Sequence, residues 1–216
     1  MPLRDVIPSR TAPFVTIILI LLNAGAFFVE QTLTEPDLHA VVMTYGLVPA
    51  SFSAGSLLTS MFLHAGWLHF LGNMLYLWIF GDNIEDRVGH WRFLLFYLAC
   101  GSAAAFGQIA ASPDSLVPMV GASGAIAGVM GAYVVLFPHS RVLTLVWVIL
   151  YVEVVEIPAL FFLGFWFVMQ LLSGVGSLGV RGGGIAFWAH AAGFLAGMAL
   201  VSVLRRPERE RIEWIE

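Results

Sequence analysis

The sequence predicts an all-α membrane protein with six transmembrane helices, and its composition is the first reason. Of its 216 residues, 59% are hydrophobic and only 11% are charged, and the mean hydropathy is +0.88. Soluble domains contain about 25% charged residues, so most of this chain is expected to lie in lipid. The net charge of −4 gives no sign of nucleic-acid binding, and the single cysteine, Cys100, leaves no disulfide framework or cysteine metal cluster.

Six long apolar segments are the second reason, because a transmembrane helix needs about 20 mostly apolar residues. They cover residues 14–33, 57–80, 91–111, 120–137, 157–174 and 185–204. Residues 1–13 form a short polar segment before the first span. We interpret that span as a retained transmembrane helix rather than as part of a cleaved signal peptide. Residues 142–151 are apolar but too short to cross a bilayer, so we interpret them as an interfacial segment. A seven-span arrangement that includes them is the alternative.

The ten arginines favour six spans with both termini in the cytoplasm, and they are the third reason. In this orientation nine arginines face the cytoplasm and only Arg181 lies outside, in agreement with the positive-inside rule. With seven spans, the tail at 205–216 and its four arginines would lie outside instead. Of the outer connections, 34–56 is expected at the outer membrane interface, and the glycine-rich 175–184 is expected to be mobile.

Polar side chains inside three of these spans are the candidates for function, because such groups are costly in a bilayer. The second span contains His64, His69 and Asn73, the fourth begins at Gly121-Ala122-Ser123-Gly124, and the sixth contains His190. Residues 69 and 73 are one turn apart and share a helix face. The three spans run in the same direction, and Ser123 and His190 lie near the outer ends of theirs. His69 lies about twelve residues into 57–80, and it reaches a similar depth if its span begins nearer Phe62. We therefore expect them to line one cavity that opens to the outside.

These side chains together supply the chemistry of a serine hydrolase, which requires no cofactor. Ser123 is the candidate nucleophile, and a neutral His190 is the base that takes its proton. Asn73 and His69 are candidate donors to the oxyanion, and Ser123 lies at a helix N-terminus, where negative charge is also favoured. No acidic residue stands near the outer ends of these spans to orient His190, so we predict a Ser–His dyad rather than a triad.

Glycine spacing predicts that the fourth and sixth spans touch. The fourth span contains a stripe of small residues, which are Gly121, Gly124, Gly128 and Gly131. The sixth contains Gly193 and Gly197 one turn apart, just after His190. Small residues allow membrane helices to approach closely, so these two stripes are expected to bring Ser123 and His190 together.

Three sequence blocks resemble the signature blocks of rhomboid intramembrane serine proteases, in the order found in that family. They are HAGWLHFLGN at 64–73, GASG at 121–124 and AHAAGFLAG at 189–197. The segments 85–89 and 157–170 also resemble bacterial members. The resemblance covers nearly the whole chain. It implies a six-helix rhomboid-like bundle in the bacterial inner membrane that cleaves transmembrane protein substrates near the outer membrane face.

The resemblance also implies a role for each candidate residue. By motif position, Ser123 matches the nucleophile, His190 matches the base, and His69 with Asn73 match the oxyanion side. His64 matches a histidine that supports the site structurally, and the fifth span with its outer loop matches the proposed lateral substrate gate. One position departs from the family pattern. Members often have an aromatic residue four positions after the nucleophile, stacked on the catalytic histidine, and here that residue is Ala127; Phe187 and Trp188 are the candidate replacements.

Less specific interpretations remain open beside these. A lone serine in a membrane helix usually packs or bonds to a backbone carbonyl, and Asn73 with His69 would then form interhelical hydrogen bonds. A zinc site from His64, His69 and His190 is disfavoured, because the i, i+5 spacing is poor and no carboxylate or thiol completes the set. For the whole protein, the alternatives are a non-catalytic rhomboid-like protein that binds membrane helices and a channel or transporter. A transporter often has internal repeats, which this sequence lacks.

Overall fold

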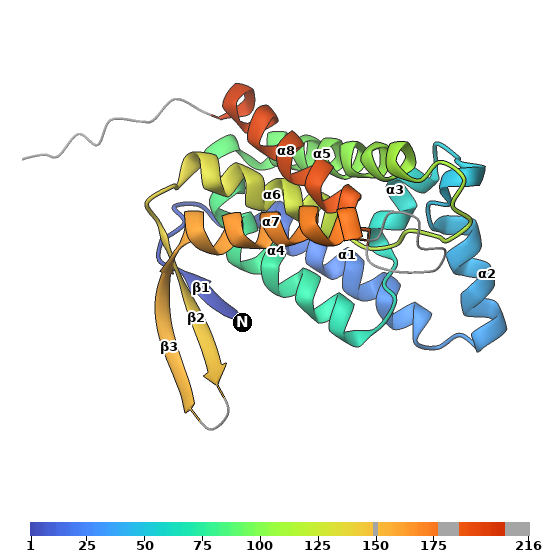
Figure 1. Cartoon of the computed structure of the whole chain (residues 1–216), viewed down its shortest axis with the longest axis horizontal. Coiled ribbons are helices and arrows are strands. Elements are labelled where there is room, and N and C mark those ends of the chain that lie inside the picture. Colours follow the sequence, from blue (N-terminus) through green and yellow to red (C-terminus); the bar gives the residue numbers. More distant parts are fainter. Residues whose placement is uncertain (149–150, 177–185, 206–216) are drawn as a thin grey trace, which may run out of the picture.

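Six helices lie side by side in the computed structural model, which describes residues 1–148, 151–176 and 186–205 (Figure 1). They are α1 (Phe14–Glu30), α4 (Trp67–Val88), α5 (His90–Ala111), α6 (Ser123–Leu136), α7 (Ala159–Gly176) and α8 (Phe187–Leu204). They follow the order of the six apolar segments. By length and composition, α5, α7 and α8 can each cross a membrane, whereas α1 and α6 are shorter apolar helices.

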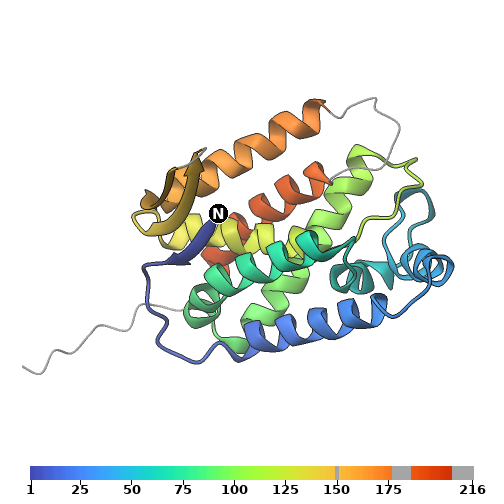
Figure 2. The same cartoon turned by 90° about the horizontal axis from the view of Figure 1, so that it is seen from below.

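The central helix α6 explains why the fourth apolar segment is short. Ten of its 14 residues, Gly124 to Tyr133, are buried by other parts of the protein. Figure 2 shows α7 along one edge of the bundle and α1 along the opposite edge, with α6 between them. A helix that is apolar all round fits an interior position, where its ends need not reach both faces of a bilayer.

The second apolar segment differs most from its predicted bounds of 57–80. Its first residues form two short turns, α3 (Ser56–Thr59) and η2 (Ser60–Phe62), and α4 begins only at Trp67. The helix then continues to Val88, past the polar residues that suggested an end. Among these, Glu85 is fully buried and its carboxylate accepts hydrogen bonds from the backbone N–H groups of Val15 and Thr16, at 2.9 and 2.8 Å. It caps the start of α1, where backbone donors lack helical partners.

A three-stranded antiparallel sheet at one end of the bundle was not predicted (Figure 1). Its strands are β1 (Pro2–Asp5), β2 (Arg141–Val148) and β3 (Tyr151–Pro158), in the order β1-β2-β3. Residues 142–148 of the segment interpreted as interfacial therefore form part of strand β2, and the all-α prediction left out this sheet. The physical reason lies in the β-branched residues of 142–157, which favour strands and which hydropathy alone does not distinguish from a short helix.

The N-terminal polar segment is anchored to the bundle through Asp5. Its carboxylate accepts hydrogen bonds from the Tyr133 hydroxyl at 2.5 Å and from the Asn83 amide at 2.9 Å. The Tyr133 hydroxyl also lies 2.7 Å from the hydroxyl of Ser140. Burial raises the pKa of Asp5 to about 6, and the nearby carboxyl of Asp82 acts in the same direction. This network connects β1 to α4 and α6.

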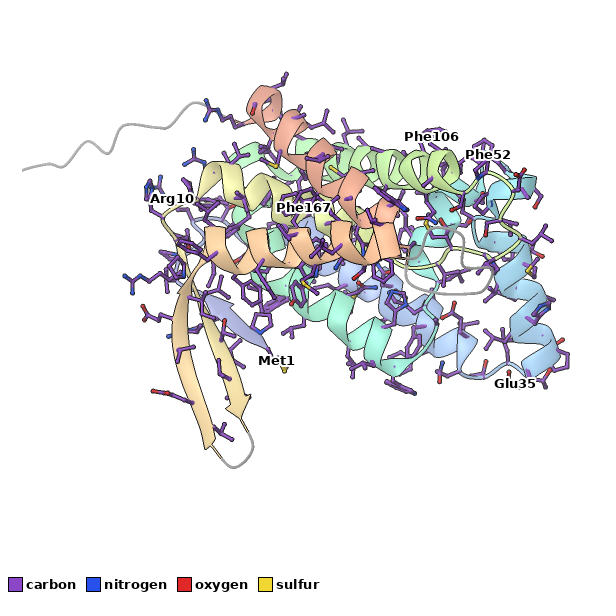
Figure 3. The ribbon with its side chains drawn as sticks, in the orientation of Figure 1. Met1, Arg10, Glu35, Phe52, Phe106 and Phe167 are labelled. Carbon is purple, nitrogen blue, oxygen red and sulfur yellow. The ribbon has the colours of Figure 1, made fainter. Side chains whose placement is uncertain are left out.

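The end of the bundle opposite the sheet is covered by the long first connection, which contains α2 (Glu35–Tyr45) and η1 (Pro49–Ser51) (Figure 1). None of the α2 side chains is buried. Phe52 packs near Phe106 at this end, with ring centroids 6.0 Å apart (Figure 3). Leu47 forms a two-bond bridge with Met119, which fixes the segment leading to α6. The expectations for the glycine-rich loop and for tail residues 206–216 lie outside the described residues.

Candidate active site

The loop before α6 places Ser123 as the first residue of that helix. Gly121 has a φ of 121°, a conformation that residues with a Cβ rarely adopt, and its N–H donates to the Ser60 carbonyl at 2.8 Å. Ala122 has no polar side-chain atom and cannot cap the first N–H groups of α6. The helix N-terminus beside Ser123 therefore favours negative charge.

Ser123 and His190 are in hydrogen-bond contact. The distance between Ser123 Oγ and His190 Nε2 is 2.8 Å, although 67 residues separate them in the sequence. His190 lies in the first turn of α8 and Ser123 in the first turn of α6, so the two helices present them at the same end. This is the geometry that a serine nucleophile and its base require.

The predicted contact between α6 and α8 is present and involves backbone against backbone. A Cβ added at Gly193 would lie 2.1 Å from the Gly124 carbonyl oxygen, and one at Gly197 would lie 1.9 Å from that of Gly128. A Cβ at Gly131 would similarly lie 2.1 Å from the backbone oxygen of Phe194. Gly121 does not belong to this stripe, because it precedes the helix and contacts His69 instead.

The imidazole of His190 contacts two α7 residues that the sequence analysis did not assign to the site. His190 Nδ1 lies 2.8 Å from Gln170 Oε1, and the Trp166 ring lies against the imidazole with centroids 5.8 Å apart. The expected replacements for the aromatic at Ala127, Phe187 and Trp188, lie beside Gly174 instead. A polar residue in the otherwise apolar fifth span was the available signal for Gln170.

His69 and Asn73 lie next to the loop that leads to Ser123. A Cβ at Gly121 would lie 2.8 Å from His69 Nε2 and 3.6 Å from Asn73 Nδ2. The Ala65 N–H donates to His69 Nδ1 at 3.4 Å, which leaves Nε2 to hold the imidazole hydrogen. Asn73 is 7% exposed, and its Nδ2 has no hydrogen-bond partner within the described residues. The side-chain N–H groups of His69 and Asn73 thus lie beside the loop that leads to Ser123, and that of Asn73 has no acceptor among the described residues.

His64 is buried behind this pair rather than in the cavity. Its ring contacts those of His69, Phe27 and Phe70, at centroid distances of 5.3, 6.1 and 5.4 Å. Its backbone N–H donates to the buried carboxylate of Glu30 at the end of α1, with distances of 3.2 and 3.3 Å to the two oxygens. These contacts fit a structural role in fixing the start of α4.

A cavity of about 870 Å³ lies between the candidate residues of α4, α6 and α8. Its walls include Ser123, His190, His69, Asn73 and Trp166. Apart from these side chains the lining is largely apolar, which is typical of a binding pocket with a few polar groups. In the part of the chain that the structure describes, no three His, Cys, Asp or Glu side chains are grouped so that they could hold a metal ion.

Comparison with known proteins identifies the family of this chain. The family model for the Rhomboid domain matches residues 52–207. The rhomboid protease GluP of Bacillus subtilis is 38% identical over 136 residues, which is 63% of this chain and 25% of GluP. YdcA of the same organism is 35% identical over 136 residues, covering 62% of this chain and 68% of YdcA. The mitochondrial rhomboid protein 1 of Saccharomyces cerevisiae is 28% identical over 149 residues, covering 66% and 40%.

The aligned region is thus only a quarter of the length of GluP and less than half of the yeast protein, although it spans about two thirds of YdcA. The match to the family model, at residues 52–207, nevertheless covers more than half of this chain. Together with the apolar helices, this match shows that the protein is an integral membrane protein of the rhomboid family.

Proposed function

We propose that this protein is an intramembrane serine endopeptidase that cleaves transmembrane protein substrates near the outer membrane face. The observation that supports this most strongly is the 2.8 Å contact between Ser123 Oγ and His190 Nε2 in the wall of an apolar cavity. Relatives named rhomboid proteases and rhomboid-type serine protease support the same reaction class. The two Bacillus subtilis relatives support a bacterial cell membrane as its location, while the yeast and Arabidopsis thaliana relatives are named as mitochondrial and chloroplastic proteins.

The reaction begins when Ser123 Oγ attacks the carbonyl carbon of a substrate peptide bond and His190 Nε2 takes the hydroxyl proton. The resulting oxyanion lies near Asn73 Nδ2, His69 Nε2 and the N-terminus of α6, which stabilise its negative charge. His190 then gives its proton to the leaving amine, and an acyl-enzyme remains. Water enters the cavity, loses a proton to His190 and attacks the acyl carbon, and the proton then returns to Ser123 Oγ as the ester bond breaks.

Six spans with cytoplasmic termini fit the distribution of charge in the bundle. Arg4 and Arg141 lie on strands of the sheet, and Arg87 and Arg92 lie where α4 meets α5. Figure 3 places Arg10 at the sheet end as well. The starts of α4, α6 and α8, with the candidate site, lie toward the opposite end (Figure 1). By the positive-inside rule the sheet faces the cytoplasm and the site faces outward.

A membrane-impermeant fluorophosphonate tests both the activity and the orientation. We expect it to label the protein in intact cells, because the activated Ser123 hydroxyl reacts with this probe from the outer side. Ser123→Ala should lose the label. Ser102→Ala should keep it, because the Ser102 hydroxyl donates to the Leu98 carbonyl at 2.9 Å on another helix. Labelling only in inside-out vesicles would reverse the orientation. Failure of the wild-type protein to react in detergent would favour a non-catalytic protein that binds membrane helices.

Asn73→Ala should lower kcat by about 10²–10³-fold, because an oxyanion donor acts mainly in the transition state. KM should change much less. Asn23→Ala is the matched control, since this buried asparagine of α1 donates to the Leu19 carbonyl at 2.8 Å and α1 contributes no residue to the wall of the cavity. Steady-state cleavage of a labelled single-span substrate in proteoliposomes measures both variants. Equal losses of kcat in the two variants would contradict an oxyanion role for Asn73.

A further inference from the structure

We propose that Gln170 is the positioning residue of His190. Through Gln170, the orientation of the His190 imidazole depends on how α7 packs against α8. This inference rests on the proposed protease function. Two side chains of α7 contact the imidazole: Gln170 through a 2.8 Å hydrogen bond to Nδ1, and Trp166 through a ring contact at 5.8 Å. The helix of the nucleophile offers neither kind of contact one turn below Ser123, because Ala127 has no ring and no polar side-chain atom.

The hydrogen bond to Gln170 selects the tautomer that the reaction needs. When Gln170 Oε1 accepts, Nδ1 holds the hydrogen of the neutral imidazole. Nε2 then presents its lone pair to Ser123 Oγ, 2.8 Å away, and can take the hydroxyl proton. The opposite tautomer would place a hydrogen on Nε2 and remove the base. An amide achieves this selection without a carboxylate, whose charge would be costly to bury inside a membrane protein.

The two residues that contact the His190 imidazole, Trp166 and Gln170, therefore lie on α7, which is the least buried of the six long helices of the bundle. Among the α7 residues, only three are buried, and they are Ala159, Leu163 and Gly174. The outward side of the helix exposes large apolar side chains, including those of Phe161, Phe165 and Leu172. Figure 2 shows this helix at the edge of the bundle. Because few of its residues are buried, little protein packing opposes a displacement of α7 away from α8, and such a displacement separates Gln170 from His190.

The contact that packs α7 against α8 lies next to Trp166 and Gln170, the two residues that contact His190. The ring of Phe167 stacks on Phe194 of α8, with centroids 4.6 Å apart and planes 22° from parallel. Phe194 is one turn after His190, and Trp166 also approaches its ring at 6.1 Å. Trp166, Gln170 and Gly174 follow at intervals of four residues, so one face of α7 meets α8. Movement of α7 away from α8 thus removes the orientation of the base, and its return restores it.

The first test compares Gln170→Leu, Gln170→Glu and the adjacent control Met169→Leu, whose native side chain is exposed. Gln170→Leu should lower kcat by about 10²-fold, the scale of a misplaced catalytic group, with little change in KM. The rate of fluorophosphonate labelling should fall by a similar factor. Gln170→Glu keeps an acceptor for Nδ1–H, so it should recover most of kcat. It should also move the acidic limb of the pH profile to higher pH, because a carboxylate stabilises the imidazolium.

The second test is a double-mutant cycle with Phe167→Ala, which loosens the α7–α8 contact without altering the hydrogen-bonding groups. This variant should lower kcat in the wild-type background and have little further effect in Gln170→Leu, because both changes remove the same orientation. Additive losses would overturn the dependence on α7.

The outcomes separate this inference from the proposed function. If Ser123→Ala abolishes cleavage while Gln170→Leu keeps kcat and labelling rate within twofold of wild type, the role of Gln170 is wrong and the protease stands. If Gln170→Leu does not fold, Gln170→Glu decides: a pH profile identical to that of the wild type overturns the role, and a shifted acidic limb supports it. Cleavage that persists in Ser123→Ala removes the proposed function itself.

Discussion

Ser123→Ala is expected to lower cleavage of a reconstituted single-span substrate by about 10⁴-fold or more, to near the background rate. The substituted side chain has no atom that can attack a carbonyl carbon, and no acyl-enzyme forms. His190→Ala should cost a similar factor, because Ser123 Oγ loses the Nε2 acceptor that lies 2.8 Å away. Quantitative gel analysis of cleavage in proteoliposomes over several hours measures losses of this size.

The double variant provides the sharper part of this prediction. Since a nucleophile and its base act as one unit, Ser123→Ala with His190→Ala should be no slower than either single variant. Ser102→Ala, on α5, should cleave at the wild-type rate. Multiplicative losses in the double variant, or unchanged cleavage in either single variant, would show that the two residues are not a catalytic pair.

The pairing of Ser123 with His190 was predictable because polar residues stand out against apolar surroundings. In a bilayer, few positions tolerate them, so a serine and a histidine at matching depth form a short list of candidates. The glycine spacing added the helix contact, since residues three and four apart share a face. Membrane segments therefore reveal a site more readily than soluble ones, where such side chains are common on every surface.

The partner of Gln170 could not be predicted from the sequence. A single glutamine on an apolar helix indicates that something binds it, but the sequence does not say which partner the bundle brings near. Its contact with His190 depends on the rotation of α7 about its own axis, and this follows from packing such as the Phe167–Phe194 stack. Ala127 indicated that support for the base had to come from elsewhere, without indicating which helix provides it.

The sheet and the extension of α4 were hidden for a related reason. Hydropathy treats the strand residues of 142–157 as it treats a short helix, although their β-branching favours strands. Polar residues near Glu85 suggested the end of a membrane segment. In the structure, the Glu85 carboxylate is satisfied by the start of α1, so the helix continues through it. Backbone N–H groups of α1, rather than water, form hydrogen bonds with this carboxylate, and a single sequence does not reveal such partners.

Gly197→Ala should destabilise the protein by about 3 kcal/mol or more and reduce cleavage with it, because the added methyl group has no room. Its carbon would lie 1.9 Å from the Gly128 carbonyl oxygen and 2.6 Å from the Gly128 Cα, and backbone atoms cannot rotate away as a flexible side chain can. Helices α6 and α8 must therefore separate by more than about 1 Å, given ordinary carbon–oxygen contacts near 3.5 Å. We expect this separation to lengthen the 2.8 Å hydrogen bond between Ser123 and His190 and so to weaken it, since hydrogen bonds weaken beyond about 3.2 Å.

Gly25→Ala on α1 is the matched control, because nothing lies within 4 Å of a Cβ built there. Alanine favours a helix over glycine by roughly 0.5–1 kcal/mol, so this variant should be as stable as the wild type or slightly more stable. On the same preparations, Gly197→Ala should lower both the unfolding midpoint in detergent and the cleavage rate, whereas Gly25→Ala should keep the wild-type cleavage rate with an equal or slightly higher midpoint. A Gly197→Ala protein with wild-type stability and activity would mean that the backbone contact between α6 and α8 does not set the distance between nucleophile and base.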